Sequence, residues 1–297
     1  MTRLSYLLTI TPRETLRLAR QRLPFFKNSR AWTAKELMSS QKFTRGIRFA
    51  EFLMRQEAIA RRSMPFPAFD FEGKRVVEVG CGPLGGYGPL AIFRGAASFE
   101  SAEPEWDASV FEEHEIIEKY LRIFHADLVA LYGQRMEFGE FHEALRSKMQ
   151  VHRCGFEAAP IEGPVDIVLS QSVLEHVFPL EQTVAKLAVI QSAETRFLHL
   201  VDFGNHYPTA DPFDGLYSVP PEEYIRKRGR AINLLRPPDI ARMFEEHSIS
   251  ARVIPSRILL HGAQGAKVPP WSEKYDADAL RVQLALVAGP DSDVKRT

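Results

Sequence analysis

The chain has little cysteine and no long apolar run. Its two cysteines, Cys81 and Cys154, lack the spacing of metal ligands and fall in predicted loops. The sequence therefore argues against a disulfide-stapled or zinc-stapled fold and favours a reducing compartment, the cytoplasm. No apolar run approaches the length of a membrane span. The segment from Leu4 to Ile10 is too short for a secretory core, so no signal peptide is expected.

The chain also has no formal net charge at pH 7, because 38 Lys and Arg residues balance 38 Asp and Glu residues. A near-neutral body does not offer the long basic groove that a nucleic-acid substrate needs. The charge is uneven, however, because residues 1–62 hold 14 Lys and Arg and 4 acidic residues. We expect this basic part to meet phosphate, an acidic glycan or the anionic inner face of a membrane, or to be a solvated face packed on the acidic remainder.

With 297 residues, of which 45% are hydrophobic, the chain can bury one α/β core with appendages, or two small domains. Helical patterns at 11–22 and 44–62 predict an N-terminal helical cap over residues 1–68. Strands and helices then alternate over 69–290, with a helical insertion at about 108–150. A polar tail, 291–297, is expected to be disordered.

A glycine-rich loop follows the first predicted strand. The mostly apolar run Val76–Val79, which includes Glu78, leads into a loop that begins with Gly80 and Gly82. Glycine allows positive φ and lets the backbone approach a ligand closely. This is how a buried parallel strand presents a nucleoside-type cofactor to the first turn of an α/β sheet.

Acidic and polar residues end the strands predicted further along. The segment 97–105 contains Glu103 and Pro104, and a carboxylate at this point can accept both hydroxyls of a ribose. Strands are also predicted at 165–171 and 196–203. Open parallel sheets bind ligands at the carboxyl ends of their strands, so we expect one site there.

These segments resemble the class I S-adenosylmethionine-dependent methyltransferases, in particular the group called methyltransferase type 11. The matching pieces are Val77–Gly82, Glu103-Pro104, and 166–170 running into 173–177. The resemblance covers about 70–205 well and 205–290 more loosely. It implies a doubly wound, mostly parallel α/β sheet of Rossmann-like type, closed by an antiparallel pair at 249–258 and 281–287, with S-adenosylmethionine as cofactor.

Two features depart from the usual pattern of this family. Leu84 stands where a third glycine is usual, and the Gly-Asp step after the third strand is absent. The adenine contact is therefore assigned to Glu157 or to backbone near Phe156. The predicted cofactor-binding residues are Glu78, Gly80, Cys81, Gly82, Gly85, Glu103, Pro104, Glu157 and Gln171.

Methyl transfer to a hydroxyl needs a group that takes the proton, and histidine suits this near neutral pH. We predict His206 as the base, oriented by Asp202, with His176 as the next candidate and helix capping as its alternative role. His199 is expected to be a packed strand residue. Because residues three apart on a strand face opposite ways, His199, Asp202 and His206 are not expected to share an ion, and no metal is predicted.

Other residues are predicted near the same site. His176 is expected to open a helix after the fourth strand, and Ser170 to contact the methionine moiety or the acceptor. Trp106 is expected either to stack on adenine or to pack in the core. Aromatic faces on one side of the cleft are expected from Tyr207, Phe213 and Tyr217.

The leading hypothesis is O-methylation of a sugar, a glycan or a small-molecule hydroxyl. An NAD-type oxidoreductase could use the same glycine loop, and a catalytically inactive scaffold that binds S-adenosylmethionine could share the fold. The Leu-Glu-His step at 174–176 weakens the first alternative. Retention of Gly80, Gly82 and Glu103 weakens the second.

Overall fold

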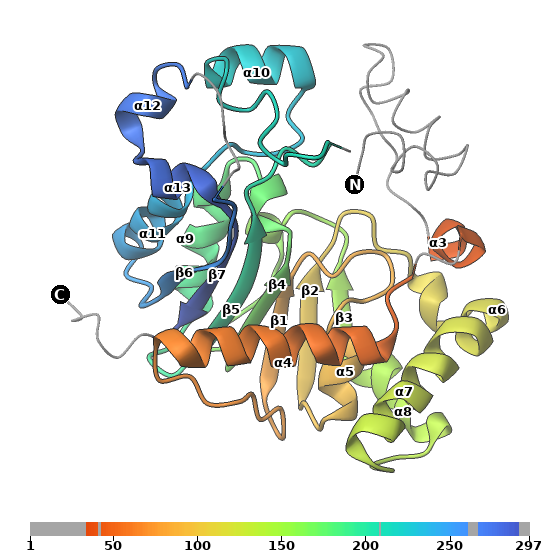
Figure 1. The fold of residues 1–297 in the computed structure, drawn as a ribbon. Coiled ribbons are helices and arrows are strands. Elements are labelled where there is room, and N and C mark those ends of the chain that lie inside the picture. Colours follow the sequence, from red (N-terminus) through yellow and green to blue (C-terminus); the bar gives the residue numbers. More distant parts are fainter. Residues whose placement is uncertain (1–33, 41–42, 208, 261–266, 291–297) are drawn as a thin grey trace.

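A seven-stranded sheet is the centre of the molecule (Figure 1). The computed structural model describes residues 34–40, 43–207, 209–260 and 267–290. The order of the strands is β3-β2-β1-β4-β5-β7-β6. Their bounds are β1 Arg75–Val79, β2 Ser98–Ala102, β3 Met149–His152, β4 Ile167–Gln171, β5 Arg196–Asp202, β6 Arg252–Ile258 and β7 Val282–Gly289. The helix expected at 11–22 and the tail lie outside the described residues.

Five strands run parallel, and β7 is antiparallel to both β5 and β6. Within the parallel part, Val77 of β1 pairs with Glu100 of β2 on one side and Val168 of β4 on the other. Residues 76–79 are all buried, as expected of a central strand covered on both faces. The predicted Rossmann-like sheet with its closing antiparallel pair is therefore confirmed.

Helices cover both faces of this sheet. One core lies under α4 (Gly46–Ser63), α5 (Gly88–Phe93), α7 (Arg122–Tyr132) and α8 (Phe138–Lys148). The other lies under α9 (Leu180–Ile190) and α11 (Pro237–Glu246). Figure 1 shows α4 lying across one face of the sheet. No helix of the described residues is long and apolar enough to cross a membrane.

The predicted helical insertion is present between β2 and β3. It contains α6 (His114–Ile116), the π-helical turn Ile117–Leu121, α7 and α8. In this segment, α7 packs on α4 and α5, and α8 packs on α5. The hydroxyl of Tyr120 donates to the carbonyl of Leu84 at 3.3 Å. The insertion thus extends one helical layer and supports the back of the glycine loop.

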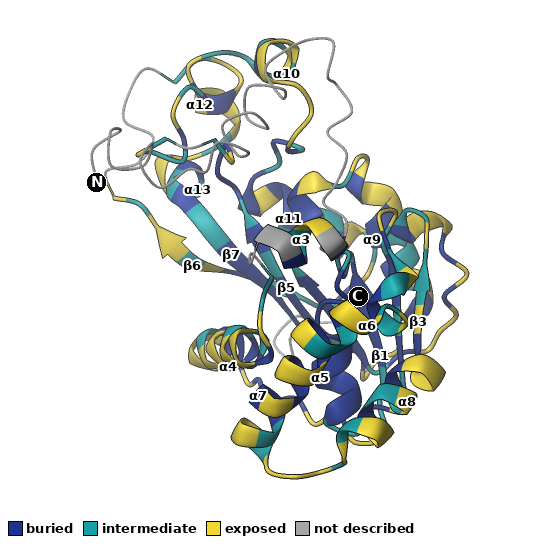
Figure 2. Cartoon of the chain, turned by 90° about the vertical axis from the view of Figure 1, so that its right-hand side faces the viewer, coloured by how far each residue is buried: buried dark blue, intermediate teal, exposed yellow. Residues whose placement is uncertain are grey.

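A third core stands above the carboxyl ends of the strands (Figures 1 and 2). It is formed around α10 (Pro221–Arg228), α12 (Trp271–Lys274) and α13 (Ala277–Arg281). Its buried side chains include Phe213, Tyr217 and Trp271. The pattern of this part of the sequence predicts α10 but neither of the other two helices, which are only four and five residues long.

Candidate functional site

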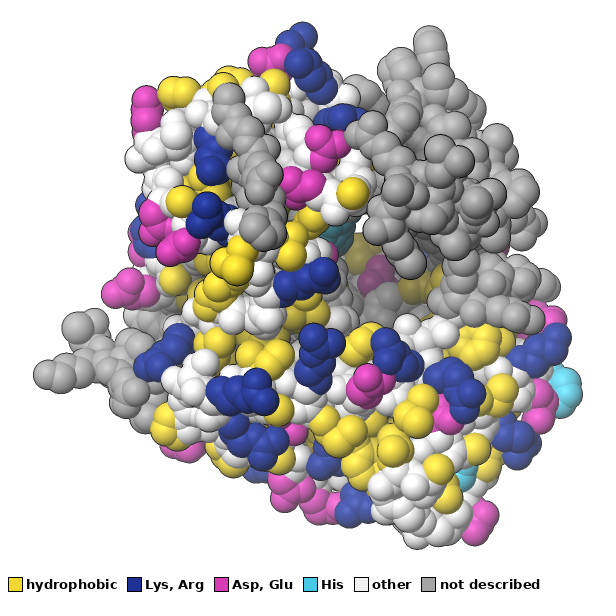
Figure 3. All heavy atoms as spheres, viewed as in Figure 1, with side chains coloured by type: hydrophobic (Ala, Val, Ile, Leu, Met, Phe, Trp, Pro, Cys, Tyr) yellow, Lys and Arg dark blue, Asp and Glu magenta, His cyan; other side chains and the backbone are white. Residues whose placement is uncertain are grey.

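The loops that follow β1, β2, β4 and β5 meet at one edge of the sheet, because parallel strands share a carboxyl edge. Figure 3 shows the surface hollowed there, between the part that carries α10 and α12 and the helix α4. Acidic and histidine side chains are visible in the hollow. This is the edge at which the sequence predicts a site.

The glycine loop has the backbone that the sequence predicts. Gly80 has φ +70°, and a Cβ there would come within 2.7 Å of Val173 on the turn after β4. Gly82 has φ +64°, and a Cβ there would meet no atom of the described residues within 4 Å. Gly80 therefore permits close packing of two turns, whereas Gly82 borders open space that a ligand can occupy.

Glu78 holds the loop from beneath. Its side chain is 1% exposed, and its Oε2 accepts from the backbone N–H of Tyr87 at 2.8 Å. Burial raises the pKa of Glu78 well above its ordinary value. The direct contact of Glu78 with a cofactor stays a prediction, since its carboxylate is bonded to Tyr87 at the far end of the loop.

Glu103 connects the end of β2 to the same loop. Its Oε2 accepts from the backbone N–H of Gly82 at 2.9 Å, and its Oε1 accepts from that of Glu105 at 3.0 Å. Pro104 follows on the exposed surface. The carboxylate thus stands beside the open space at Gly82, where the resemblance predicts a ribose.

Gln171 ends β4 beside this loop. Its Oε1 accepts from the hydroxyl of Tyr87 at 3.1 Å and from the side-chain amide of Gln56 on α4 at 2.5 Å. Two buried groups therefore fix the carbonyl of its side chain and set the direction of its amide. Its predicted role in cofactor binding stays a prediction.

The remaining predicted cofactor residues have different surroundings. Cys81 is 6% exposed and packs in the core under α4, so burial raises its thiol pKa, and the thiol donates to the carbonyl of Gly82 at 3.4 Å. Gly85 makes room for Met149, whose Cε lies 2.8 Å from the position of a Cβ. Glu157 is exposed in the short 3-10 helix Phe156–Ala158, after β3. Trp106 is buried against Phe111.

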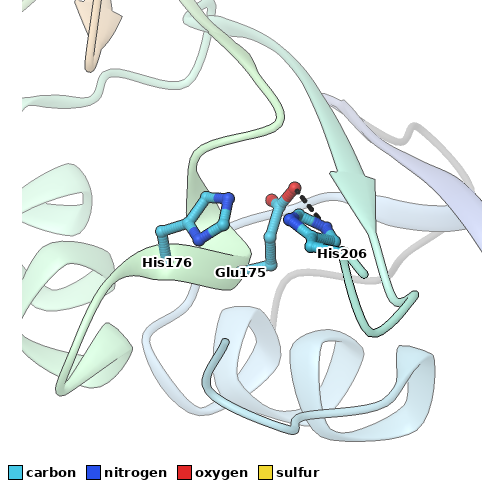
Figure 4. Close-up of side chains that lie close together, drawn as sticks. All are labelled: Glu175, His176 and His206. Carbon is cyan, nitrogen blue, oxygen red and sulfur yellow. Dashed lines mark ion pairs between the residues drawn. The ribbon is translucent and has the colours of Figure 1, made fainter. Parts of the chain in front are cut away.

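On the other side of the edge, the acceptor-side cluster consists of Glu175, His176, Asp202 and His206 (Figure 4, which draws all but Asp202). The Nε2 of His206 lies 3.9 Å from Glu175 Oε1 and 3.8 Å from Asp202 Oδ2. The His176 and His206 rings meet edge to face with centroids 4.8 Å apart. The structure thus brings Asp202 and His206 together, and their catalytic roles stay predictions.

Two residues of the cluster are held by the backbone around them. His176 ends a 3-10 turn, Leu174–His176, and its Nδ1 is 2.6 Å from the carbonyl of Ala231. The expectation that His176 opens a helix is wrong, because α9 begins only at Leu180. His206 has φ +56°, a left-handed conformation that is strained for a residue with a Cβ.

Burial shifts the pKa values of two residues in this cluster. It raises the pKa of Glu175 to about 8 and lowers that of His206, although the nearby carboxylate of Asp202 acts in the opposite direction on His206. A neutral imidazole at neutral pH can accept a proton. The cluster is therefore suited to taking a proton from a bound hydroxyl.

The same side chains have the residue types of a metal site. Ligand atoms of Glu175, His176 and His206 all lie within 4.8 Å of one another. Ligands bonded to one tetrahedral zinc stand about 3.4 Å apart, since each bond is about 2 Å long. The three groups can hold an ion only after closing around it, so proton chemistry fits the observed geometry better.

Three expectations for neighbouring residues have clear outcomes. His199 is fully buried, and burial lowers its pKa to about 3, so it is a packed strand residue as predicted. Ser170 lies 2.9 Å from His199 Nδ1 and is itself buried, which removes it from the ligand side. Phe213 and Tyr217, expected among the aromatic faces of the cleft, are buried in the third core.

Sequence reasoning assigned no role to Glu175. A glutamate in a Leu-Glu-His step looks like a surface residue of a turn, yet the turn buries it so that its side chain is 3% exposed. Its two apolar neighbours, Leu174 and Val177, were the available signal, because they anchor the turn in the core. Asn233 completes the arrangement by donating to the carbonyl of Leu174 at 2.7 Å.

No family model matches the chain, and no curated protein matches it in sequence. Among solved structures it is similar to an S-adenosylmethionine-dependent methyltransferase from Mesorhizobium loti, with 12% identity over 78% of this chain and 94% of that one and a TM-score of 0.41. A methyltransferase from Aquifex aeolicus gives 11% identity, 73% and 81% coverage and a TM-score of 0.35.

The phosphoethanolamine N-methyltransferase 2 of Haemonchus contortus, solved in complex with S-adenosyl-L-methionine, is also similar. Identity is 14%, coverage is 76% of this chain and 46% of that one, and the TM-score is 0.41. These low scores carry no functional conclusion. Function is therefore inferred from the side chains and backbone of the site itself.

Proposed function

We propose that the protein is an S-adenosylmethionine-dependent methyltransferase that acts on a hydroxyl group. One observation carries the proposal. The glycine loop, with Glu103 bonded to the N–H of Gly82, lies on the same sheet edge as the acceptor-side cluster. A nucleoside-binding loop is thus placed next to groups that can take a proton.

The residues present fit this cofactor. Glu103 is positioned for the ribose hydroxyls, and the open space at Gly82 admits the nucleoside. The amide of Gln171, whose direction Gln56 and Tyr87 set, is suited to the methionine carboxylate. When bound, S-adenosylmethionine supplies an activated methyl group on a sulfonium, which leaves the protein to orient the acceptor and exclude water.

His206 is the proposed general base. Its imidazole would take the proton of the acceptor hydroxyl as that oxygen receives the methyl group, and the sulfonium would leave as a neutral thioether. Asp202, at 3.8 Å from Nε2, orients the ring and stabilises the imidazolium that forms. His176 is the alternative base, and its Nδ1 contact with Ala231 leaves Nε2 as the nitrogen that could accept a proton.

The proposed acceptor is a sugar, a glycan or a small molecule with a free hydroxyl. Tyr207 supports a ring-shaped acceptor, since it is partly exposed in the loop after β5 and has Arg228 over its ring at 4.9 Å. The basic segment 1–62 supports an acceptor linked to phosphate or lipid. We place the reaction in the cytoplasm or at the inner membrane face, without nucleic acid as a partner.

Calorimetry with S-adenosylmethionine and S-adenosylhomocysteine tests the cofactor. We expect binding of both, with no quenching or enhancement of NADH fluorescence on addition of the protein. Radiolabelled methyl transfer to a panel of sugars, lipid-linked sugars, RNA and protein then tests the acceptor. Binding of NADH without S-adenosylmethionine would replace this proposal with the oxidoreductase alternative, and cofactor binding without transfer to any acceptor would favour the inactive scaffold.

A further inference from the structure

We propose that Glu175 is a positioning residue that holds the ring of His206 and controls its affinity for the acceptor's proton. The proposal rests on the proposed function, since His206 is the base of that reaction. It gives a role to a buried carboxyl that the motif alone leaves unexplained. Glu175 thus acts on the step in which the acceptor hydroxyl gives up its proton.

Glu175 connects the three segments that form the acceptor side. Its Oε1 accepts from the backbone N–H of Asp202, at the end of β5, at 3.3 Å. Its backbone carbonyl accepts from the N–H of Asn233, ahead of α11, at 2.7 Å. Figure 4 shows its side chain between His176 and His206, with Oε1 directed at His206. A change at this carboxyl therefore acts on the base through direct contact.

The second carboxylate oxygen of Glu175 differs from the first in its surroundings. Oε2 of Glu175 is buried without a hydrogen bond among the described residues. A buried polar atom of this kind is costly unless something pairs with it. A proton held by the carboxyl, or a group of the bound acceptor, would satisfy this atom.

The surroundings of Glu175 favour its uncharged form at neutral pH. Burial raises its pKa to about 8, and the carboxylate of Asp202 acts in the same direction. The titratable groups that face it are Asp202 and His206 from the end of β5 and its loop, and His176 from its own turn. Keeping Glu175 neutral keeps His206 neutral as well, so the ring is ready to receive a proton.

The expected pH dependence follows from the raised pKa of Glu175 and the lowered pKa of His206. Below the pKa of His206 the ring carries a proton and cannot act as a base. Above pH 8 Glu175 ionises, the imidazole then lies between two carboxylates, and its affinity for a proton increases. In the wild type we expect kcat to rise about threefold to tenfold through pH 8, which is a modest share of what a general base contributes.

The test compares Glu175→Gln with Glu57→Gln. Glutamine keeps the shape of the acid and can still accept from Asp202 N–H, but it does not ionise. Glu57 is a matched control: it is 4% exposed, burial raises its pKa, and it accepts from Phe69 N–H at 2.6 Å, near the opposite edge of the sheet. We expect E175Q to match the wild type within about threefold near pH 7, to lack the rise through pH 8, and to leave KM unchanged. E57Q should keep the rise.

A loss of kcat by the same factor at every pH would show a structural role for Glu175 and overturn the proposal. A rise through pH 8 that persists in E175Q would also overturn it. The test stays valid if the acceptor differs from the proposed class, because NMR titration of the His206 ring needs no turnover. There the ring signals of His206 should show a second inflection near pH 8, where the neighbouring Glu175 ionises, and this inflection should be absent from E175Q and present in E57Q.

A second inflection near pH 8 that persists in E175Q would refute the pairing even in an active enzyme. Conversely, an inflection that E175Q removes in a protein that transfers no methyl group would retain the pairing and reject the methyltransferase. The two proposals therefore fail separately.

Discussion

At the residue scale, the carboxyl groups of the site differ strongly in their surroundings. Glu103 is partly exposed and bonded to the glycine loop, whereas Glu175 is buried between two imidazoles. The first can exchange its backbone partners for ribose hydroxyls at little cost. The second cannot be solvated, so its protonation is linked to that of its neighbours.

Replacing Glu103 with Ala is expected to weaken binding of S-adenosylmethionine by about 2–4 kcal/mol, because hydrogen bonds to a charged group contribute about 1.5–3 kcal/mol each. The backbone N–H of Gly82 also loses its acceptor. Calorimetry measures the change. Glu105→Ala is the control, since it alters an exposed neighbour but keeps the backbone N–H that donates to Glu103. Equal affinity in E103A and wild type would remove Glu103 from the cofactor site.

Replacing His206 with Ala is expected to lower turnover by about 10²–10⁴-fold and to leave cofactor affinity nearly unchanged, as for loss of a general base. Turnover of the wild type should fall as the pH drops below the pKa of His206, which burial lowers from its usual value. The measurement is a pH–rate profile of both proteins, with His114→Ala, an exposed histidine of α6, as control.

EDTA distinguishes this mechanism from one that uses a metal. Activity should persist after dialysis against the chelator, because a base needs no ion. Loss of activity that zinc or manganese restores would reassign Glu175, His176 and His206 as metal ligands.

At the element scale, the helical insertion is joined to α4 by a close contact and a buried acid. Gly46 begins α4, and a Cβ there would lie 2.8 Å from the carbonyl of Phe124 on α7. Asp127 of α7 is 7% exposed, forms an ion pair with Arg45 and accepts from the backbone N–H of Ile47 at 3.3 Å. One side chain thus fixes the start of α4 against the insertion.

Asp127→Ala is therefore expected to reduce the free energy of unfolding by about 0.5–1.5 kcal/mol, the usual net contribution of a hydrogen bond, since the donors left behind belong to the exposed residues Arg45 and Ile47. Urea denaturation measures this. Glu115→Ala removes one partner of an exposed ion pair on the same insertion and should change stability by less than about 0.5 kcal/mol. Similar effects of the two substitutions would show that the contact between α4 and α7 contributes little.

At the scale of the whole molecule, three hydrophobic cores are arranged around the sheet. Two lie on the faces of the sheet and the third stands above its carboxyl edge, so the site is bounded by parts of the chain far apart in sequence (Figures 1 and 2). The basic segment 1–62 joins this arrangement through α4, whose Gln56 contacts Gln171 at the end of β4.

Deletion of residues 1–23, which carry five arginines, is expected to weaken association with acceptor or with anionic vesicles more than cofactor binding. Calorimetry with S-adenosylmethionine and sedimentation with vesicles of anionic lipid compare the two effects. A control in which the five arginines become glutamine keeps the length of the chain. A truncated protein that binds vesicles as well as the full chain would contradict the role given to this segment.

The sequence by itself determined the sheet and the location of the site. A short, mostly apolar run such as Val76–Val79 that leads into glycines favours a buried central strand, and the positive φ of Gly80 and Gly82 follows from residues that tolerate it. Carboxyl ends of parallel strands share an edge, so Glu103, Gln171 and Asp202 were predicted to face one site. These inferences depend on local preferences and on rules of sheet topology.

Only the tertiary structure decided which polar groups are buried together. The pairing of Glu175 with His206 joins a turn after β4 to a loop after β5, and the third core hides Phe213 and Tyr217, which the sequence placed in the cleft. Burial is a property of all the neighbours of a side chain, and those neighbours come from distant segments. Because desolvation by these neighbours sets the pKa of Glu175, the local pattern could indicate a buried turn but not the pKa of this residue.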